Sequence, residues 1–316
     1  MNLEQLRGVV EIAETGHFTR AAERLHIAQP TLSRQISTLE TELGAPLFHR
    51  IRGNVVLTQA GERLLPLARR MLADADTART ELAELAGLRR GRIRLGATPT
   101  LCTSLVADVL AEFHAQYPGI DIEILERGSR TLIDALMEGA LDLALIVTSV
   151  SSGEARAVLD LEPILSERLV VVSAASADDP FPRAADGAPV ELHELARTPQ
   201  VVFPESYDLR VAMDAAFRAA DLTPLVVVEG AEMDAALRFA ERGIGVAVVP
   251  AMVAALHPAL RAAPLADAAL ARTVSIARRS DMVPARASAA LQTLIRGVAD
   301  RLTAPGGPAS VVTRVG

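Results

Sequence analysis

The sequence predicts a multidomain α+β chain in which a small helical domain with a β-hairpin precedes one long helix and a larger two-lobed α/β domain. Apolar residues recur at helical spacing through most of residues 1–90. From residue 91 to about residue 303, short apolar strands alternate with helices instead. With 316 residues, 50% of them hydrophobic, the chain is long enough for two or three domains with cores of their own.

Composition restricts the class of partner and the compartment. The formal net charge is −7, so any contact with nucleic acid must come from a local patch. Cys102 is the only cysteine, which excludes an intramolecular disulfide framework and predicts a reducing compartment. Residues 1–15 have an amphipathic pattern rather than that of a signal peptide, and the apolar run 244–256 is too short to span a bilayer. We therefore expect a cytoplasmic protein without membrane contact.

The first domain, residues 1–58, is predicted to contain three short helices and a hairpin. The first helix ends near Gly16, and the second runs from Arg20 to His26. The third helix has Pro30 in its first turn and ends at Gly44. Residues 46–57, with a central Gly-Asn pair, predict the β-hairpin that completes the domain.

The third helix has one apolar stripe and, opposite to it, a short polar face nearly free of acidic residues. The stripe contains Leu32, Ile36, Leu39 and Leu43, spaced as expected for ~100° per residue. The opposite face contains Pro30, Thr31, Ser33, Arg34, Ser37, Thr38 and Thr41. Short hydroxylated side chains let a helix approach DNA base edges, and an arginine can bind guanine through two hydrogen bonds. A solvated face of a small helical bundle is the alternative interpretation.

A longer pattern supports the DNA-binding interpretation. Residues 18–36 read FTRAAERLHIAQPTLSRQI, followed by Leu39-Glu40, Leu43-Gly44, Leu47-Phe48 and the segment 57–61, LTQAG. Residues 1–61 closely resemble the DNA-binding domain of LysR-type transcriptional regulators. The resemblance implies a winged helix-turn-helix with Gln29, Pro30, Thr31, Ser33 and Arg34 at the DNA-facing start of the recognition helix. It places Arg50 and Arg52 in the wing, within reach of phosphate or a minor groove.

Residues 59–90 predict a long linker helix that makes dimers. Apolar residues alternate in steps of four and three, which is a heptad pattern. Its positions are Leu64, Ala68, Met71, Ala75, Ala78, Leu82 and Leu85. Nothing obvious within the chain covers so long a stripe, although packing on the C-terminal domain is the alternative. The family resemblance supports a homodimer and implies a homotetramer.

Residues 91–303 predict two α/β lobes with parallel strands, because a glycine, a helix, a second glycine and an apolar strand follow one another in both halves. We expect lobe I at about 92–163 and 266–303, and lobe II at about 164–265, with the first strand of lobe II at 169–173. This resembles the periplasmic-binding-protein fold of LysR-type effector domains. Residues 304–316 are rich in Pro and Gly and predict a disordered tail.

Ligands of open α/β sheets bind beyond the carboxyl ends of the strands. The residues expected there, as the lining of an effector pocket, are Thr98, Thr100, Gly128, Ser129, Val147, Thr148 and Phe203. Hydroxyl groups at helix N-termini favour a carboxylate or another small anion. Ordinary N-capping is the alternative for each Ser or Thr taken singly. Arg127 and Arg130, beside this site, either clamp the anion or are simply exposed.

Catalytic motifs are absent from the sequence. It lacks a G-x-S-x-G elbow, a P-loop and an H-E-x-x-H motif, and its six His residues show no ligand spacing. These absences predict no enzyme, no metal and no cofactor. Cys102 lies in the first turn of a helix, whose dipole is expected to lower the thiol pKa; redox sensing and an inert buried thiol are the alternatives.

The combined interpretation is a sequence-specific transcriptional regulator. We expect its partners to be double-stranded DNA and a small effector, with RNA polymerase as a further candidate. The resemblance implies that effector binding between the lobes changes the angle between linker helices, and with it the geometry of DNA binding. The alternative is a cytoplasmic solute-binding protein without direct gene regulation.

Overall fold

The computed structural model describes residues 1–51, 54–85, 91–148, 159–186, 188–205, 207–267, 270–304 and 312–315. The chain divides into two compact units. Unit 1 contains Met1–Arg92 together with Asp134–Asp142, and unit 2 contains Ile93–Ile133 together with Leu143–Gly316. In the described part of the chain, every helix is too short or too polar to span a bilayer.

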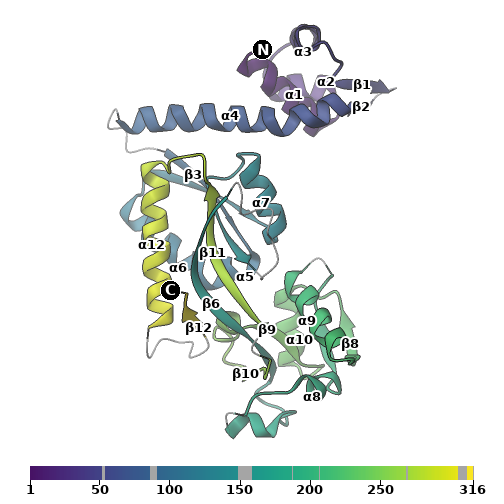
Figure 1. The fold of residues 1–316 in the computed structure, drawn as a ribbon, viewed down its shortest axis with the longest axis vertical. Helices are drawn as coiled ribbons and strands as arrows, with labels where there is room; N and C mark the ends of the chain where they lie inside the picture. Colours follow the sequence, from purple (N-terminus) through teal and green to yellow (C-terminus); the bar gives the residue numbers. More distant parts are fainter. Residues whose placement is uncertain are drawn as a thin grey trace. The chain divides into compact units, whose positions relative to one another are not determined.

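Unit 1 begins with the predicted helices and hairpin, drawn in purple in Figure 1. These elements are α1 (Leu3–Thr15), α2 (Phe18–Arg24), α3 (Gln29–Leu43), β1 (Phe48–Ile51) and β2 (Asn54–Leu57). The capping box of Asn2 and Gln5 begins α1, which ends at Gly16 with the left-handed φ of 67°. Gly44 ends α3 in the same way, with φ 70°. The sequence therefore predicted both helix ends.

Two close contacts fix the hairpin to the helices. The antiparallel pair β1–β2 has Ile51 opposite Asn54, and the amide of Val55 donates a 2.9 Å hydrogen bond to the carbonyl of Gly16. Where the chain enters α4 (Gln59–Leu85), the Thr58 hydroxyl accepts a 3.1 Å hydrogen bond from the amide of Gly61. A Cβ atom on Gly61 would lie 2.2 Å from the carbonyl oxygen of Leu47, so this crossing requires glycine.

The heptad positions of α4 divide into two groups. Leu64 packs against the core of the helical domain, and Ala68 is fully buried. Met71, Ala78 and Leu82 are exposed, and Leu82 has an exposed fraction of 67%. Ala75 is half-buried, and the side chain of Leu85 lies outside the described part. The expectation that nothing in the chain covers the stripe is therefore wrong for its first two positions.

Unit 2 is built on a mixed eight-stranded sheet with the order β10-β6-β11-β5-β3-β4, in which β9 and β12 also pair with β6. The strands are β3 (Gly91–Ala97), β4 (Ile120–Glu126), β5 (Leu143–Thr148), β6 (Leu159–Ala174), β9 (Ala247–Pro250), β10 (Leu260–Pro264), β11 (Ala271–Arg279) and β12 (Val312–Arg314). β3 and β5 are parallel, as predicted, whereas β11 is antiparallel to β5.

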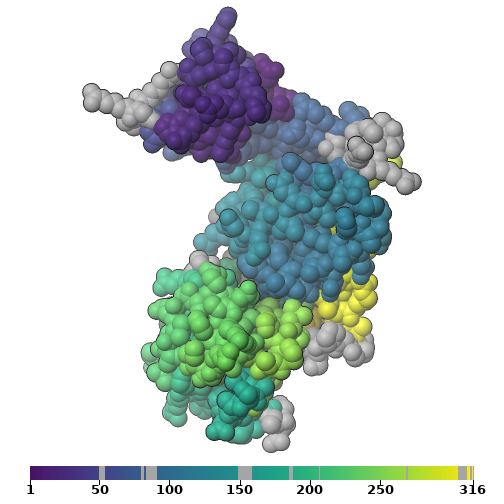
Figure 2. Space-filling view, turned by 180° about the vertical axis from the view of Figure 1, so that it is seen from behind, coloured from purple at the N-terminus to yellow at the C-terminus, as the bar shows by residue number. Residues whose placement is uncertain are grey.

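Helices cover this sheet and a smaller one. Lobe I has α5 (Pro99–Leu101), a π-helix (Cys102–Val106), α6 (Ala107–Gln116), α7 (Ser129–Met137) and α12 (Arg286–Thr303). Lobe II adds a 3-10 helix (Pro182–Asp186), α8 (Leu192–Ala196), the parallel strands β7 (Gln200–Val202) and β8 (Val226–Glu229), α9 (Asp208–Ala219), α10 (Met233–Glu241) and α11 (Ala251–Ala254). Figure 2 shows the green residues of lobe II gathered in one mass next to the teal residues of lobe I.

The long strands β6 and β11 connect the lobes (Figure 1). Residues 159–168 of β6 pair with β11, whereas residues 169–174 pair with β9 and β10. The strand thus begins at Leu159 and continues past the expected boundary at 163–164. The apolar pattern of the sequence predicts a start only at residue 169, because Glu162, Glu167 and Arg168 interrupt it.

The C-terminal segment also differs from the prediction. Within the tail expected to be disordered, Val312–Arg314 form β12, antiparallel to β6, with Val312 opposite Glu167. Val312 is buried and joins the apolar core of lobe I. Burial of this valine and pairing with β6 stabilise the strand at 312–314, whose residues are neither Pro nor Gly.

Candidate functional site

The predicted polar face of α3 is exposed and its apolar stripe is buried. Leu32, Ile36 and Leu39 are fully buried in the core of the helical domain. The exposed face consists of Gln29, Pro30, Thr31, Arg34, Ser37, Thr38 and Thr41, with Ser33 half-buried. Leu43 was predicted to belong to the stripe but is 43% exposed, because the last turn before Gly44 extends past the core.

Hydrogen bonds within α3 order part of this face. The Gln29 side chain donates a 3.0 Å bond to the Ser33 hydroxyl, and the Thr38 hydroxyl donates a 2.9 Å bond to the carbonyl of Arg34. Among the described residues, the Arg34 guanidinium makes no hydrogen bond or ion pair of its own. Its five N–H donors therefore remain available to an external acceptor.

The turn between α2 and α3 sets the direction of α3. His26 has φ 55°, in the left-handed region that side chains rarely adopt, and its amide donates a 3.1 Å bond to the carbonyl of Glu23. The predicted second helix extends to His26, whereas α2 ends at Arg24 and His26 belongs to the turn. On the hairpin, Arg50 belongs to β1 opposite Val55. Its side chain and all of Arg52 lie outside the described residues, so their contact with DNA stays a prediction.

Four of the expected effector residues lie in two pairs at the strand ends of lobe I. The hydroxyls of Thr98 and Thr100, both buried, are 3.5 Å apart at the start of α5. The Ser129 hydroxyl, at the start of α7, accepts a 3.0 Å hydrogen bond from the amide of Val147. The Thr98 side chain makes no capping hydrogen bond to α5, and the hydrogen bond of the Ser129 hydroxyl joins it to β5.

The remaining expected residues are more dispersed. Thr148 lies against β11, with its hydroxyl 3.1 Å from that of Ser275, and Gly128 is exposed. Phe203 is buried in lobe II, where its ring stacks on Tyr207 at 5.5 Å and 10°. Among the described residues, no hydrogen bond or ring contact joins Phe203 to the four residues in lobe I. Their convergence on one pocket stays a prediction.

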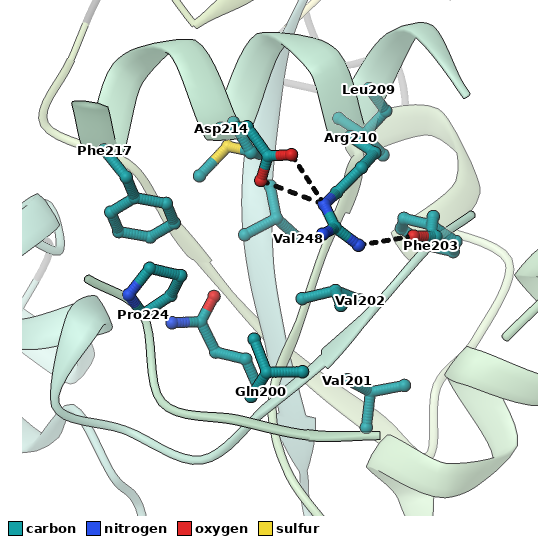
Figure 3. Close-up of a pocket in the computed structure, with 12 residues that line it drawn as sticks. Gln200, Val201, Val202, Phe203, Leu209, Arg210, Asp214, Phe217, Pro224 and Val248 are labelled. Atoms are coloured by element: carbon teal, nitrogen blue, oxygen red, sulfur yellow. Dashed lines mark hydrogen bonds and ion pairs between the residues drawn. The ribbon is translucent and has the colours of Figure 1, made fainter. Parts of the chain in front are cut away.

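Beside Phe203, lobe II contains a small cavity between β7, β8 and α9 (Figure 3). Its volume of about 40 Å³ is room for a few water molecules at most. Arg210 lies at its wall and donates to the Phe203 carbonyl at 2.9 Å, to both oxygens of Asp214 at 2.9 and 2.8 Å, and to Glu229 at 2.9 Å. Because all three of its guanidinium nitrogens donate well-directed hydrogen bonds to the chain, Arg210 stabilises lobe II and is a poor candidate for binding a ligand.

A buried ion pair, which the sequence did not predict, contacts Thr100. Glu167 of β6 is fully buried, and its Oε1 accepts a 2.6 Å hydrogen bond from Nε of Arg272 on β11. Nη1 of Arg272 donates a 2.8 Å bond to the Thr100 hydroxyl. Nothing in the sequence marked these residues, because isolated charges in a strand usually indicate a solvated face.

Cys102 is a half-buried free thiol whose surroundings disfavour the thiolate. Burial, followed by the negative charge of Glu126, raises the pKa of its thiol to about 11. The expected lowering by a helix dipole is therefore wrong, because loss of hydration opposes the thiolate more strongly. The described residues also contain no group of three or more His, Cys, Asp or Glu side chains that could hold a metal ion.

Comparisons with known proteins match both parts of the chain. A family model described as bacterial regulatory helix-turn-helix protein, lysR family, matches residues 3–62, and one for the LysR substrate binding domain matches residues 86–300. A probable nitrogen assimilation transcriptional activator of Synechococcus elongatus is 34% identical over 87% of this chain and 88% of its own length. The HTH-type transcriptional regulator IlvR of Caulobacter vibrioides is 32% identical over 96% of this chain and 100% of its own.

Solved structures have the same architecture. A full-length OxyR variant from Pseudomonas aeruginosa aligns with a TM-score of 0.71 at 27% identity, covering 95% of each chain. Full-length CbnR in complex with its target DNA aligns with a TM-score of 0.64, covering 94% of this chain and 100% of its own. The 22% identity of CbnR supports the fold alone.

Proposed function

The chain belongs to the LysR family of DNA-binding transcriptional regulators, and we propose that it binds discrete palindromic sites through the exposed face of α3 and responds to a small organic anion. The predictions of the family, the fold class and the regulatory function are confirmed. Its relatives are transcriptional regulators, so the interpretation as a plain solute-binding protein is set aside.

One observation carries the proposal for DNA binding. On α3, three fully buried leucine and isoleucine side chains hold the helix in the domain, while Arg34 and hydroxylated side chains are exposed on the opposite face. A recognition helix must insert such a face into the major groove, where arginine reads guanine and small side chains permit close approach. The net charge of −7 means that a local surface, and not the chain as a whole, must attract the phosphates.

Dimerisation through α4 would supply the second recognition helix. Met71, Ala78 and Leu82 remain exposed on this helix, and exposed apolar side chains at heptad positions favour pairing with another helix. We propose a homodimer through these residues and a homotetramer on the family pattern. A two-fold symmetric dimer reads two half-sites, hence the palindromic target.

The effector is proposed to bind at the strand ends of lobe I, near Thr98, Thr100 and Ser129. Its binding would change the angle between linker helices, and so the DNA geometry, to the extent that it prefers one arrangement over the other. Acting on DNA, the protein would work in the cytoplasm without catalysing a reaction. RNA polymerase is a further proposed partner.

Genome-wide DNA capture with the full chain tests the proposal. The protein should enrich discrete palindromic sites, and Arg34→Ala should lose them. Arg79→Ala is the matched control, because Arg79 is an exposed arginine on α4 that pairs with Asp76. Enrichment unchanged in Arg34→Ala, or no enriched site at low salt with a dimeric sample, contradicts the proposal.

A further inference from the structure

The two strands that connect the lobes contain a cross-strand ion pair in an unusual setting. Arg272 of β11 and Glu167 of β6 lie directly opposite each other in the sheet. Glu167 is fully buried and the Arg272 side chain is 13% exposed. The same strands have a second pair of this kind, Arg278 opposite Asp160, but there the carboxylate is 47% exposed. Glu167 and Arg272 are thus a desolvated pair with an exposed counterpart for comparison.

The pair does not have the geometry that arginine and carboxylate usually adopt. Nε and Nη2 of Arg272 approach the same oxygen, Oε1 of Glu167, at 2.6 and 2.5 Å. The other oxygen, Oε2, accepts a 3.0 Å hydrogen bond from the amide of Met252. Nη2 is buried and makes no well-directed hydrogen bond. Arginine normally gives two parallel bonds to two oxygens, whereas here two nitrogens share one oxygen and Nη2 has an ionic contact without a well-directed hydrogen bond.

The Nη1–Nη2 edge of the guanidinium lies beside the expected effector residues. Nη1 donates to the Thr100 hydroxyl at 2.8 Å, and the Thr98 hydroxyl is 3.5 Å from that of Thr100. Nη1, Nη2 and two hydroxyl groups thus form a set of donors that one more carboxylate would satisfy. An unmet buried donor is costly, and a ligand oxygen removes that cost.

We propose that Arg272 determines the specificity of the effector site for a small carboxylate, and that Glu167 both holds the guanidinium in place and competes with the ligand for it. This inference rests on the proposed effector function of lobe I. The ligand carboxylate binds the Nη1–Nη2 edge of Arg272 and accepts from Thr100 or Thr98. A neutral isostere of the ligand lacks the charge that the guanidinium selects.

Thermal unfolding of the full chain with acetate as the probe, and acetamide as its neutral isostere at matched ionic strength, tests the assignment. Acetate should raise the unfolding midpoint and acetamide should not. Arg272→Gln should abolish the acetate response, and Arg272→Lys should restore only part of it, because lysine lacks the fork. Glu167→Gln should tighten the apparent Kd for acetate at least ~10-fold, since the competing charge is removed.

The exposed pair provides matched controls. Arg278→Gln and Asp160→Asn alter the same two strands and should leave the acetate response as in the unchanged protein. If Glu167→Gln fails to fold, Thr100→Val replaces it, and it should weaken acetate binding at least ~3-fold without changing the response to acetamide. An acetate response that persists in Arg272→Gln, or no acetate response in any variant, overturns the proposal.

DNA footprinting distinguishes this inference from the proposed function. Acetate binding that depends on Arg272, without any change in footprint, supports the carboxylate site and contradicts its role as the effector site. If Arg34→Ala loses DNA binding but keeps the acetate response, the carboxylate site is supported independently of the DNA-binding proposal.

Discussion

Gly61 and Leu47 lie so close together that the start of α4 and the entry to β1 touch backbone to backbone. A Cβ on Gly61 would lie 2.2 Å from the carbonyl oxygen of Leu47 and 2.8 Å from a methyl of Leu57. The same carbonyl accepts a 2.9 Å hydrogen bond from the amide of Thr58. The hairpin and the linker helix therefore cannot separate at this point without a movement of the main chain.

Gly61→Ala should destabilise unit 1, because the methyl group forces the backbone of Leu47 to move. Overpacking of this kind costs about 1–3 kcal/mol of unfolding free energy. Denaturant unfolding followed by circular dichroism measures it. The control is Gly297→Ala in α12, where the nearest atom to a new Cβ is the Arg301 guanidinium at 3.8 Å. That change should stabilise its helix by about 0.5–1 kcal/mol. Equal effects of the two substitutions would contradict the close contact.

Arg34→Ala should weaken binding to the captured site by about 1–3 kcal/mol and relax the preference at one base pair. The reason is that a guanidinium directed at a base edge discriminates that base, whereas a phosphate contact does not. Affinities for a set of operator variants at fixed salt concentration measure the loss. A uniform loss over all operator variants would instead assign Arg34 to the phosphate backbone.

The pair formed by Glu162 of β6 and Arg296 of α12 makes stability depend on pH. Arg296 donates 2.6 and 2.7 Å bonds to the two carboxylate oxygens, and the hydrogen bonding keeps the pKa of Glu162 below its usual range. Because the pKa of Glu162 is lower in the folded state than in the unfolded state, the ionised carboxylate stabilises the fold above the unfolded pKa of about 4.3. This stabilisation is lost as the pH falls through the pKa of the folded state. Both side chains are over 40% exposed, so solvent screening limits the effect to about 1 kcal/mol or less.

Unfolding midpoints of the unchanged protein and of Glu162→Gln, measured from pH 7 down to pH 3, test this dependence. The two should differ at neutral pH and converge as the carboxylate protonates. Added salt should reduce the difference at pH 7. A gap that widens in acid would show that the pair does not stabilise the fold through its charge.

Cys102 should react slowly with iodoacetamide at pH 7, because a thiol with a pKa of about 11 contains very little thiolate there. The rate should still be rising at pH 10, beyond the range in which an ordinary thiol has levelled off. Glu126→Gln should lower the thiol pKa and increase labelling at pH 9. Mass spectrometry of the labelled peptide gives the rates, and fast labelling at pH 7 would revive the redox-sensing alternative.

The sequence predicted those features that depend on local periodicity. The burial of Leu32 and Ile36 and the stop at Gly44 follow from helical spacing and from the left-handed preference of glycine, and each can be derived from a few neighbouring residues. The expectation that no other part of the chain covers the apolar stripe of α4 was wrong for Leu64 and Ala68. A heptad pattern shows that a stripe will be covered, but it does not show which surface covers it.

Thr98 and Thr100 of the proposed carboxylate site were predicted, but Glu167 and Arg272 could not be, because these residues meet only through the sheet. Thr100 and Arg272 are 172 positions apart, and strand pairing alone places Glu167 opposite Arg272. In the sequence each of these charges resembles a solvent-exposed strand position. Only the register of β6 against β11 shows that they are buried and paired.

The order of β6 and β11 along the chain affects synthesis as well as ligand binding. Lobe I needs β11 and α12, yet the whole of lobe II separates them from β6 in the sequence. No single proteolytic cut can release an intact lobe, and during translation β6 leaves the ribosome before its partner exists. Until β11 emerges, the edge of β6 that it covers is open to pairing with other nascent chains, and aggregation can then compete with folding.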